Sequence, residues 1–497
     1  MILVLAAALA LQTAPPDPAR ADHGPDGDDE TVRPAPLVDY AAAGRAAVEA
    51  RLAVRPNTGR AQNAIVFIAD GMDITTTTAA RILDGQRRGE PGEENVLAFE
   101  ALPHTALAKT YNTDAQVPDS AGTATAILSG RKTRAGVVNV DQTVERGDCE
   151  GAEGKRLDTL GDLAASLGKS VGVVTTARIT HATPASLYAS SPDRDWESDA
   201  DLPEGVRCPD IARQLISRRD ELNLAVAFGG GRQAFTTEGK RRDGRDLLSE
   251  WARSGEVVLD AEGFAALDPM ASAPVLGLFA DSHLAYEADR TDAEPSLADM
   301  TRFAIEKLAE DREGYVLLVE GGRVDHAHHG GNAARALFDV IAFDEAVETA
   351  LSLTDSDETL IVVTADHGHT LTFQGYPRRG NPVLGIVKPV GSTGGEASKA
   401  SDGQTYTTLG YANGPGAPHL VGKPSPRPGP SDDEAQDVDY RQQSAVPAFS
   451  ETHGGQDVIV YAGGPGAWLV GGVLEQNVLY HVVRHALTTA SDDPKTP

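Results

Sequence analysis

The sequence predicts an α/β fold with a doubly wound, mostly parallel central sheet that helices flank. Six short apolar runs rich in β-branched residues end in polar or glycine-rich turns, at 63–71, 169–177, 223–231, 314–322, 359–368 and 456–464. Such runs are typical of buried parallel strands. Amphipathic stretches such as 156–168 and 297–311 lie between them, and this alternation indicates a doubly wound sheet. The low aromatic content, 5%, suits this class better than a β-sandwich.

The first 36 residues do not continue this pattern. Residues 1–14, MILVLAAALALQTA, contain an apolar run that is too short to span a bilayer and is typical of a signal peptide. We therefore expect a periplasmic or secreted protein without a transmembrane anchor. The run lacks the usual basic start, so an apolar terminus without export function is the alternative. Residues 15–36 are rich in Pro and Asp and predict a disordered linker, so ordered structure should begin at Leu37.

Charge and cysteine content exclude some functions and suggest one covalent link. The chain has 44 basic and 73 acidic residues, a net charge of −29 at pH 7, which argues against specific binding of nucleic acid. Cys149 and Cys208 are the only cysteines. In an exported protein they would pair and close a loop of about 60 residues. Two free thiols are expected if the protein is not exported.

One segment interrupts the strand and helix pattern. Residues 381–449 are rich in Gly, Pro, Ser and Asp, as in GSTGGEASKASDGQ, and periodicity returns at ETHGGQDVIVYAGG. Structureless loops of this length are uncommon inside compact domains. We interpret the segment as an insertion or long surface loop within one domain that spans residues 37–497.

Potential metal ligands follow the predicted strands. Ligands of open α/β sheets bind beyond the carboxyl ends of the strands. Asp325 and His329 are four residues apart and would share one face of a helix that begins after EGGR, and His453 precedes the last strand. The other strand-end residues are Asp70, residues 180–183, Glu320, Asp366 and His367.

Each of these residues has an ordinary explanation by itself. Asp70 can cap a helix, Asp366 can lie in a turn, and the histidines can form a solvated helix face. Carboxylates and imidazoles together at several strand ends are not explained by turn chemistry, and they suit zinc. The oxygen set of Asp70, Thr183 and Glu320 suits magnesium. The sequence therefore predicts a metal cluster.

A nucleophile candidate lies in VPDSAGTATAILSG, residues 117–130. Ser120 would stand at the start of a helix of small residues, where free backbone N–H groups favour an anion. An ordinary N-cap serine is the alternative. A neighbouring metal favours the first interpretation, because coordination can ionise a hydroxyl and make it a nucleophile.

These motifs together resemble the alkaline phosphatases, in the same order, from about residue 60 to 490. They include ADGM, VPDSAGTATAILSG, GVVTTARITHATPASLYA, DWESDADLP, GLFADSHLAYE, VEGGRVDHAHHGG, TADHGHT and ETHGGQDVIVYAGGPGAWL. The resemblance implies hydrolysis of phosphate monoesters at alkaline pH through a phosphoserine. It also implies a homodimer with two zinc ions and one magnesium ion.

The resemblance also implies roles for individual residues. The first zinc would bind Asp325, His329 and His453, and the second zinc would bind Asp70, Asp366, His367 and the Ser120 oxygen. Magnesium would bind Asp70, Thr183 and Glu320, and Arg194 would bind phosphate. His181 and His326 match two histidines that the animal enzymes place near magnesium, so the sequence resembles the animal-type branch.

The chain departs from the family pattern at three places. Asp73 stands where glycine is usual and could alter the start of the following helix. Ala280 replaces an acidic residue of the animal enzymes' calcium site, so we do not predict calcium. The insertion at 381–449 matches the crown of the family, at the dimer interface, in position only.

Two other functions compete with this interpretation. Phosphodiesterases and sulfatases share the superfamily, and SSPDR, residues 190–194, fits the S-x-P-x-R pattern of sulfatases. The Leu-x-Thr-Gly that usually follows this pattern is missing. The other alternative is an acidic surface protein that binds metal without catalysis, but it would not require the ordered motifs or the serine.

Overall fold

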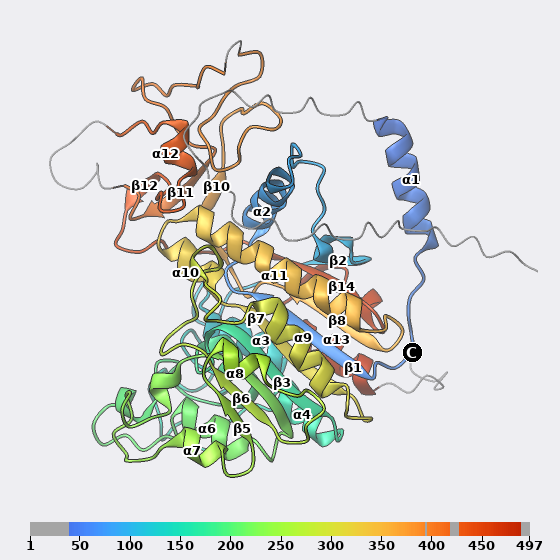
Figure 1. Ribbon diagram of the computed structural model, residues 1–497, viewed down its shortest axis with the longest axis vertical. Coiled ribbons are helices and arrows are strands. Elements are labelled where there is room, and N and C mark those ends of the chain that lie inside the picture. Colours follow the sequence, from blue (N-terminus) through green and yellow to red (C-terminus); the bar gives the residue numbers. More distant parts are fainter. Residues whose placement is uncertain (1–38, 393–394, 418–426, 489–497) are drawn as a thin grey trace, which may run out of the picture. The chain divides into compact units, whose positions relative to one another are not determined.

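Ten strands form the central sheet of the fold (Figure 1). Their order is β15-β2-β14-β8-β1-β7-β3-β4-β6-β5. All six predicted strands are present, as β1, β3, β4, β7, β8 and β14, and the predicted fold class is confirmed. The strands of this sheet are β1 Asn63–Ala69, β2 His104–Lys109, β3 Ser170–Arg178, β4 Leu224–Gly230, β5 Glu256–Val258, β6 Val275–Leu278, β7 Tyr315–Gly321, β8 Thr359–Thr364, β14 Val458–Gly463 and β15 Gly472–Glu475.

The computed structural model describes residues 39–392, 395–417 and 427–488. These residues belong to one compact unit. The predicted signal peptide, 1–14, and linker, 15–36, lie outside the described residues. Among the helices of the described ranges, none has the length and apolar character needed to cross a membrane.

Helices cover both faces of the sheet (Figure 1), which explains why β7 is buried along its whole length. On one face α9 and α11 contact the central strands, and α2 packs on α11. On the other face α4, α5 and α13 contact the sheet, with α3 packed on α5 and α13. The helices are α1 Tyr40–Ala53, α2 Ile74–Arg87, α3 Ser120–Ser129, α4 Leu160–Ser166, α5 Ala182–Tyr188, α6 Ile211–Arg218, α7 Leu247–Trp251, α8 Ala261–Ala265, α9 Leu297–Leu308, α10 Arg323–His329, α11 Ala333–Leu353, α12 Asp432–Gln436 and α13 Val478–Thr488.

The orientation predicted for one strand is wrong. The sequence predicts β14 to be parallel to the others, but β14 pairs antiparallel with both β8 and β2. A buried apolar run has the same composition in either direction, so the pattern carries no information on orientation. In the centre of the sheet the prediction is correct, because β1 pairs parallel with both β7 and β8.

The segment at 381–449 contains regular structure that the sequence pattern did not reveal. Strands β11 (Leu409–Gly414) and β12 (Ser444–Pro447) pair with each other and, through β11, with β10 (Leu371–Phe373). Helix α12 also lies in this segment. A second small sheet pairs β9 (Gly368–His369) with β13 (His453–Gly454), and this pairing brings two distant histidines together.

Cys149 and Cys208 form the expected disulfide, with a sequence separation of 59 residues. The bond joins the loop after α3 to the loop that leads into α6. The helix start at α6 is itself capped by Asp210, whose side chain accepts a hydrogen bond from the Arg213 backbone N–H. The bond between Cys149 and Cys208 limits how far residues 149–208 can expand in the unfolded chain.

We expect the double variant Cys149→Ala/Cys208→Ala to be less stable than wild type by up to about 4 kcal/mol, the closure entropy of a loop of this length. Turnover should be unchanged at moderate temperature, since neither cysteine contacts the residues of the site described below. Urea unfolding of the variant and of wild type with its disulfide intact measures the difference in the free energy of unfolding. Equal midpoints and slopes for the two proteins would contradict the prediction.

Candidate active site

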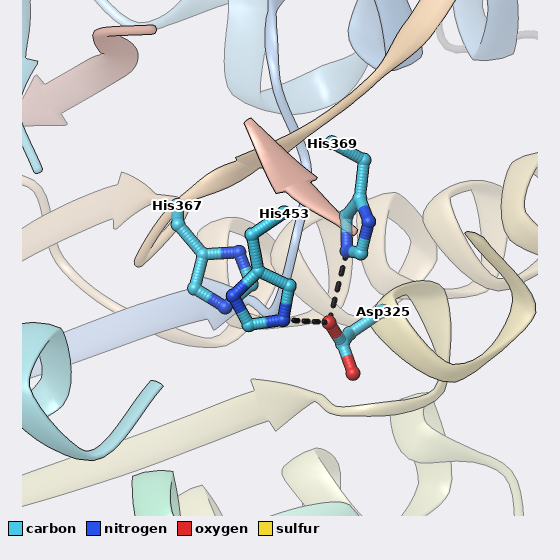
Figure 2. Close-up of side chains that lie close together, drawn as sticks. All are labelled: Asp325, His367, His369 and His453. Atoms are coloured by element: carbon cyan, nitrogen blue, oxygen red, sulfur yellow. Dashed lines mark hydrogen bonds and ion pairs between the residues drawn. The ribbon is translucent and has the colours of Figure 1, made fainter. Parts of the chain in front are cut away.

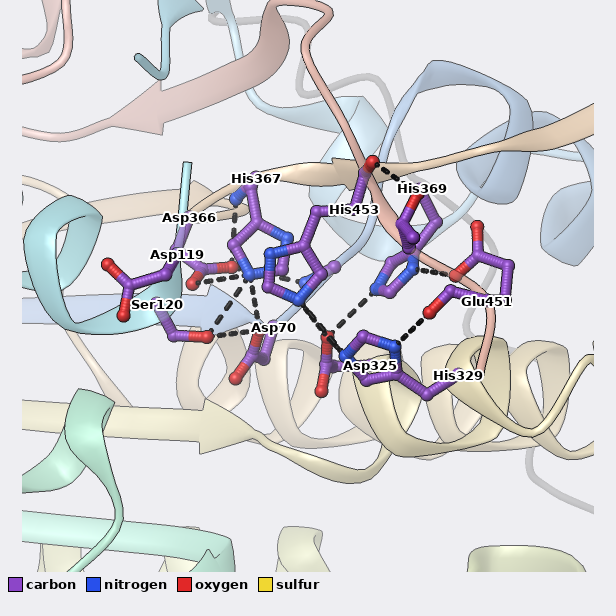
Figure 3. Close-up of polar contacts among 12 residues, drawn as sticks. Asp70, Asp119, Ser120, Asp325, His329, Asp366, His367, His369, Glu451 and His453 are labelled. Carbon is purple, nitrogen blue, oxygen red and sulfur yellow. Dashed lines mark hydrogen bonds and ion pairs between the residues drawn. The ribbon is translucent and has the colours of Figure 1, made fainter. Parts of the chain in front are cut away.

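The candidate site lies at the carboxyl edge of the three central strands (Figure 3). Asp70 directly follows β1, Glu320 is near the end of β7, and Asp366 and His367 follow β8. In the parallel register Ile68 of β1 pairs with Glu320 on β7 and with Thr364 on β8. Because parallel strands end at the same edge, this register places the carboxylates together.

The first group of ligands comes from α10 and β13. Asp325 and His329 lie one turn apart on α10, and His329 Nε2 is 3.3 Å from Asp325 Oδ1. His453 Nε2 is 3.3 Å from the same oxygen and 3.0 Å from His329 Nε2. Figure 2 shows His453 and His369 pointing at Asp325. Three of the predicted ligands of one zinc ion therefore converge.

The second group surrounds His367. Its Nε2 atom is 3.3 Å from both Asp70 Oδ1 and Asp366 Oδ2. Ser120 Oγ is 3.1 Å from the same nitrogen and 3.5 Å from Asp70 Oδ1. Burial and the stacked imidazole of His453 hold the pKa of His367 well below its ordinary value. The neutral ring can offer a lone pair to a metal.

The third group contains buried oxygen atoms without partners. Within the described ranges, Asp70 Oδ2, Thr183 Oγ1 and Glu320 Oε1 are buried and accept or donate no hydrogen bond. The ligand atoms of Asp70, Glu320 and His181 lie within 4.8 Å of one another. Buried polar atoms without partners are costly in free energy. These atoms fit a cation that they would coordinate.

Electrostatics supports the same conclusion for the whole cluster. Burial, followed by repulsion from neighbouring carboxylates, raises the pKa of Asp70 well above its ordinary value. Burial is also the main cause of the raised pKa of Asp366, and it raises the pKa of Glu320 to about 8. Carboxylates arranged in this way need positive charge to remain ionised at neutral pH. The donor set therefore fits divalent metal ions.

Ser120 is the first residue of α3 and is not its N-cap. The N-cap is Asp119, whose carboxylate accepts hydrogen bonds from the backbone N–H groups of Ala121 and Gly122. The alternative of an ordinary N-cap serine is therefore wrong. Because Asp119 satisfies the helix start, the Ser120 hydroxyl is left to point at His367 and Asp70.

Arg194 lies beside this serine although it is far away in the sequence. Its Nη1 donates to Asp119 Oδ2 at 3.1 Å, and its Nη2 donates to His181 Nε2 at 2.9 Å. The Arg194 side chain is 17% exposed. Its neighbours in the acidic run, Asp193 and Asp195, pair instead with Arg146. A planar fork in this position suits two oxygens of a phosphoryl group.

The predicted residues thus lie together, as groups that could hold metal ions, a serine and an arginine. A family model of alkaline phosphatase matches residues 61–489. The chain belongs to the alkaline phosphatase family. It is 42% identical over 454 residues to the tissue-nonspecific alkaline phosphatase of Homo sapiens. The alignment covers 86% of this chain and 84% of that protein. The alkaline phosphatase of Gadus morhua is 41% identical to this chain over 453 residues, and the alignment covers 86% of this chain and 92% of that protein.

The solved structure of Thermus thermophilus alkaline phosphatase is also similar. It has a TM-score of 0.63 at 27% sequence identity and covers 88% of this chain and 93% of that one. As a member of the alkaline phosphatase family, the protein is a metal-dependent phosphomonoesterase. The relationship to the animal enzymes confirms the resemblance to that branch. It does not support the sulfatase alternative.

The two histidines expected near magnesium lie close together, with a third that the sequence analysis missed. The rings of His181 and His326 are 5.5 Å apart, and His283 lies 4.1 Å from His326. Burial is the main cause that lowers the pKa of His326 to about 3. His283 contacts the Arg178 guanidinium, which in turn binds Glu197. The sequence offered little to identify His283, since it follows β6 in an irregular loop.

Two further residues of the site were also missed. His369 Nε2 is 2.9 Å from Asp325 Oδ1, and His369 Nδ1 is 2.6 Å from Glu451 Oε2. Burial alone would lower the pKa of His369, but hydrogen bonds to both carboxylates raise it to about 10. The spacing could have indicated both residues, since His369 is two residues after His367 and Glu451 two before His453.

Asp73, where this chain departs from the family, begins α2 normally. Its Oδ1 accepts a hydrogen bond from the Thr76 backbone N–H, and its Oδ2 accepts one from Gln456 Nε2. Gln456 Nε2 also donates to the His369 carbonyl oxygen. The carboxylate therefore links the helix start to the segment that carries two site histidines.

We expect cation binding at the third group to depend on pH. Glu320 has a pKa of about 8 without metal, so below about pH 8 a cation must displace a proton, and above it the carboxylate is already ionised. The affinity for Mg²⁺, measured by calorimetry, should fall by at least about tenfold for each pH unit below pH 8, because the pKa of Asp70, the second carboxylate of this group, is raised as well.

Two variants serve as controls for this pH dependence. Glu320→Gln should bind weakly and with a shallower slope, because one titrating carboxylate is gone and Asp70, whose pKa is also raised, remains. Thr183→Ala should bind more weakly at every pH and keep the slope. A wild-type affinity that does not change between about pH 6 and 8 would contradict the prediction.

Proposed function

We propose that the chain hydrolyses phosphate monoesters through a phosphoserine formed on Ser120. The observation that supports this most directly is the position of the Ser120 hydroxyl. It is buried at 2% exposure, 3.1 Å from His367 Nε2 and beside Asp70, where the second and third ligand groups meet. It also lies at the N-terminus of α3 and next to the Asp119–Arg194 ion pair.

We propose that the three ligand groups hold two zinc ions and one magnesium ion. The first zinc would bind Asp325, His329 and His453. The second zinc would bind Asp70, Asp366, His367 and the Ser120 oxygen, and magnesium would bind Asp70, Thr183 and Glu320. Ions bound there would lower the pKa of hydroxyl groups and water and neutralise charge on the transferred phosphoryl group.

The protein side chains then have defined tasks in the reaction. The ionised Ser120 Oγ attacks phosphorus, a new O–P bond forms, and the bond to the leaving oxygen breaks in line with it. The leaving oxygen takes up a proton and departs as the alcohol. Water next attacks the phosphoserine, which releases inorganic phosphate and restores the serine. Arg194 would hold two non-bridging oxygens during both steps.

Asp119 and His181 would orient the arginine for this task. Each contacts one terminal nitrogen of the guanidinium, so the plane of Arg194 is defined by two hydrogen bonds. Activity at alkaline pH agrees with the raised pKa values of Asp70, Asp366 and Glu320, because these groups bind cations only when ionised.

We also propose that the protein is a homodimer. Helix α1 has no buried residue, and Tyr40, Val48 and Leu52 are 65%, 58% and 69% exposed. A helix of this length is marginal in water without a packing partner. Other exposed apolar side chains lie in or near the sheet β10-β11-β12: Phe373, Tyr376, Val446 and Phe449. Sedimentation equilibrium tests the proposal, which a monomeric mass at micromolar concentration would contradict.

We propose that residues 37–497 form one catalytic domain, with 381–449 as a crown-like insertion. Residues 1–14 would direct the protein to the periplasm or the medium, and residues 15–36 would link them to the domain. The disulfide between Cys149 and Cys208 supports export, since such bonds persist in oxidising compartments. N-terminal sequencing of the mature protein would test this, and an intact Met1 would contradict it.

Ser120→Ala should lower turnover of an aryl phosphate by about 10³-fold or more, because it removes the attacking oxygen. The fold and the metal content at the first zinc site should be retained. Ser129→Ala is a matched control, since Ser129 is a buried serine on the same helix whose hydroxyl contacts only the Arg131 carbonyl. Labelled phosphate trapped at low pH should be found on Ser120, and label on another residue would refute the proposal.

Arg194→Ala should keep its metal ions and lose phosphate binding. The loss of one charge-assisted bidentate contact costs about 1.5 to 3 kcal/mol, or roughly 10- to 150-fold in kcat/KM for monoesters. Diesters have one fewer charged oxygen and should suffer less. Arg146→Ala is the control, because Arg146 binds the acidic neighbours of Arg194. Equal phosphate inhibition constants for Arg194→Ala and wild type would exclude the role.

A further inference from the structure

Glu451 lies beside the first ligand group but is not one of the proposed ligands (Figure 3). Its side chain is fully buried. Oε1 accepts hydrogen bonds from the Thr370 backbone N–H and hydroxyl, both at 2.6 Å, and Oε2 accepts one from His369 Nδ1 at 2.6 Å. The carboxylate is therefore held in one orientation by three donors.

The backbone of the same residue holds His329. The Glu451 carbonyl oxygen accepts a hydrogen bond from His329 Nδ1 at 2.6 Å, and the Glu451 N–H donates to the His329 carbonyl at 3.0 Å. Because a carbonyl can only accept, the proton of neutral His329 is on Nδ1. This leaves the lone pair on Nε2, the nitrogen that faces Asp325 and His453.

The side chain of Glu451 acts on Asp325 through His369. His369 lies between two carboxylates, with Nδ1 toward Glu451 and Nε2 toward Asp325 at 2.9 Å. The imidazole ring therefore connects the Glu451 carboxylate to the Asp325 carboxylate. His369 lies near enough to Asp325, His367 and His453 to share a metal ion with them. Its Nε2 atom faces Asp325 Oδ1, so the orientation of this carboxylate depends on His369.

We propose that Glu451 is the positioning residue of the first metal site. It orients two of the three ligands, Asp325 through His369 and His329 through its own backbone. The third ligand, His453, follows two residues later, and its Nδ1 donates to the Pro118 carbonyl at 2.8 Å. The inference rests on the proposed binding of zinc by Asp325, His329 and His453.

The test compares Glu451→Ala, Glu451→Gln and Asp344→Asn as full-length proteins. Asp344 is a matched control, because it is a largely buried carboxylate that accepts two backbone hydrogen bonds, from Ala98 and Phe99, and contacts no site residue. Zinc affinity is measured by competition with a chromogenic chelator. The absorption spectrum of the Co²⁺-substituted protein reports the ligands of the ion.

Glu451→Ala should weaken one of the zinc sites by about 10- to 100-fold, the usual effect of losing an orienting partner. Its Co²⁺ spectrum should also change, because Asp325 loses the orientation that Glu451 imposes on it through His369. Glu451→Gln retains an acceptor for Thr370 and a polar partner for His369, so it should recover most of the affinity. Asp344→Asn should keep the wild-type affinity and spectrum.

His369→Asn tests the same connection without altering residue 451, in case Glu451→Ala does not fold. It should weaken the same zinc site to a similar extent. Wild-type zinc affinity and Co²⁺ spectrum in Glu451→Ala or in His369→Asn would overturn the inference and leave the proposed site standing. A wild-type protein that binds no zinc would overturn the proposed site itself, and the inference with it.

Discussion

The burial of neighbouring carboxylates is the constraint on which the rest of the site depends. Burial raises the pKa of Asp70, Glu320 and Asp366, whereas hydrogen bonds from His369 and His453 outweigh burial and lower the pKa of Asp325. Asp70, Glu320 and Asp366 are fully buried, and Asp325 is 4% exposed. In a medium of low dielectric constant, such groups either take up protons or surround cations. Without metal, protons on Asp70, Asp366 or Glu320, whose pKa values burial raises, relieve this cost. Metal ions would replace those protons, and their binding free energy would contribute to the stability of this edge of the sheet.

The antiparallel orientation of β14 follows from the same requirement. His453 precedes β14 by a few residues, and β14 pairs antiparallel with β8, with Val460 opposite Thr364. Its start therefore lies at the carboxyl end of β8, where Asp366 and His367 are. Strand β2 pairs antiparallel with β14, so it ends at this edge too, and the chain continues from there toward Ser120. A parallel β14 would place His453 at the opposite edge of the sheet.

The sequence allowed prediction of the ligands but not of the groups that hold them. Asp70, Glu320 and Asp366 could be predicted because each follows or ends a recognisable strand, and Asp325 and His329 because their spacing fits one helix face. His283 lies in an irregular segment and reaches the site through contacts across 105 residues of sequence. For Glu451 the short spacing to His453 was a signal, but its contact with His369 spans 82 residues and could not be predicted. The direction of β14 was missed because burial patterns do not depend on strand direction. The strands at 409–414 and 444–447 were missed because they are short and lie among Gly and Pro.

The net charge of the chain determines where affinity for an anionic substrate must come from. At −29 the protein as a whole repels phosphate esters, but at physiological ionic strength charges beyond about 8 Å are largely screened. In the proposed function, attraction would therefore arise within the site, from Arg194 and from the cations that it would hold. Since Arg194 is already paired with Asp119, its charge is partly compensated before substrate arrives. Most of the favourable potential at the phosphoryl group must then come from the ions, so any residue that orients their ligands also affects substrate binding.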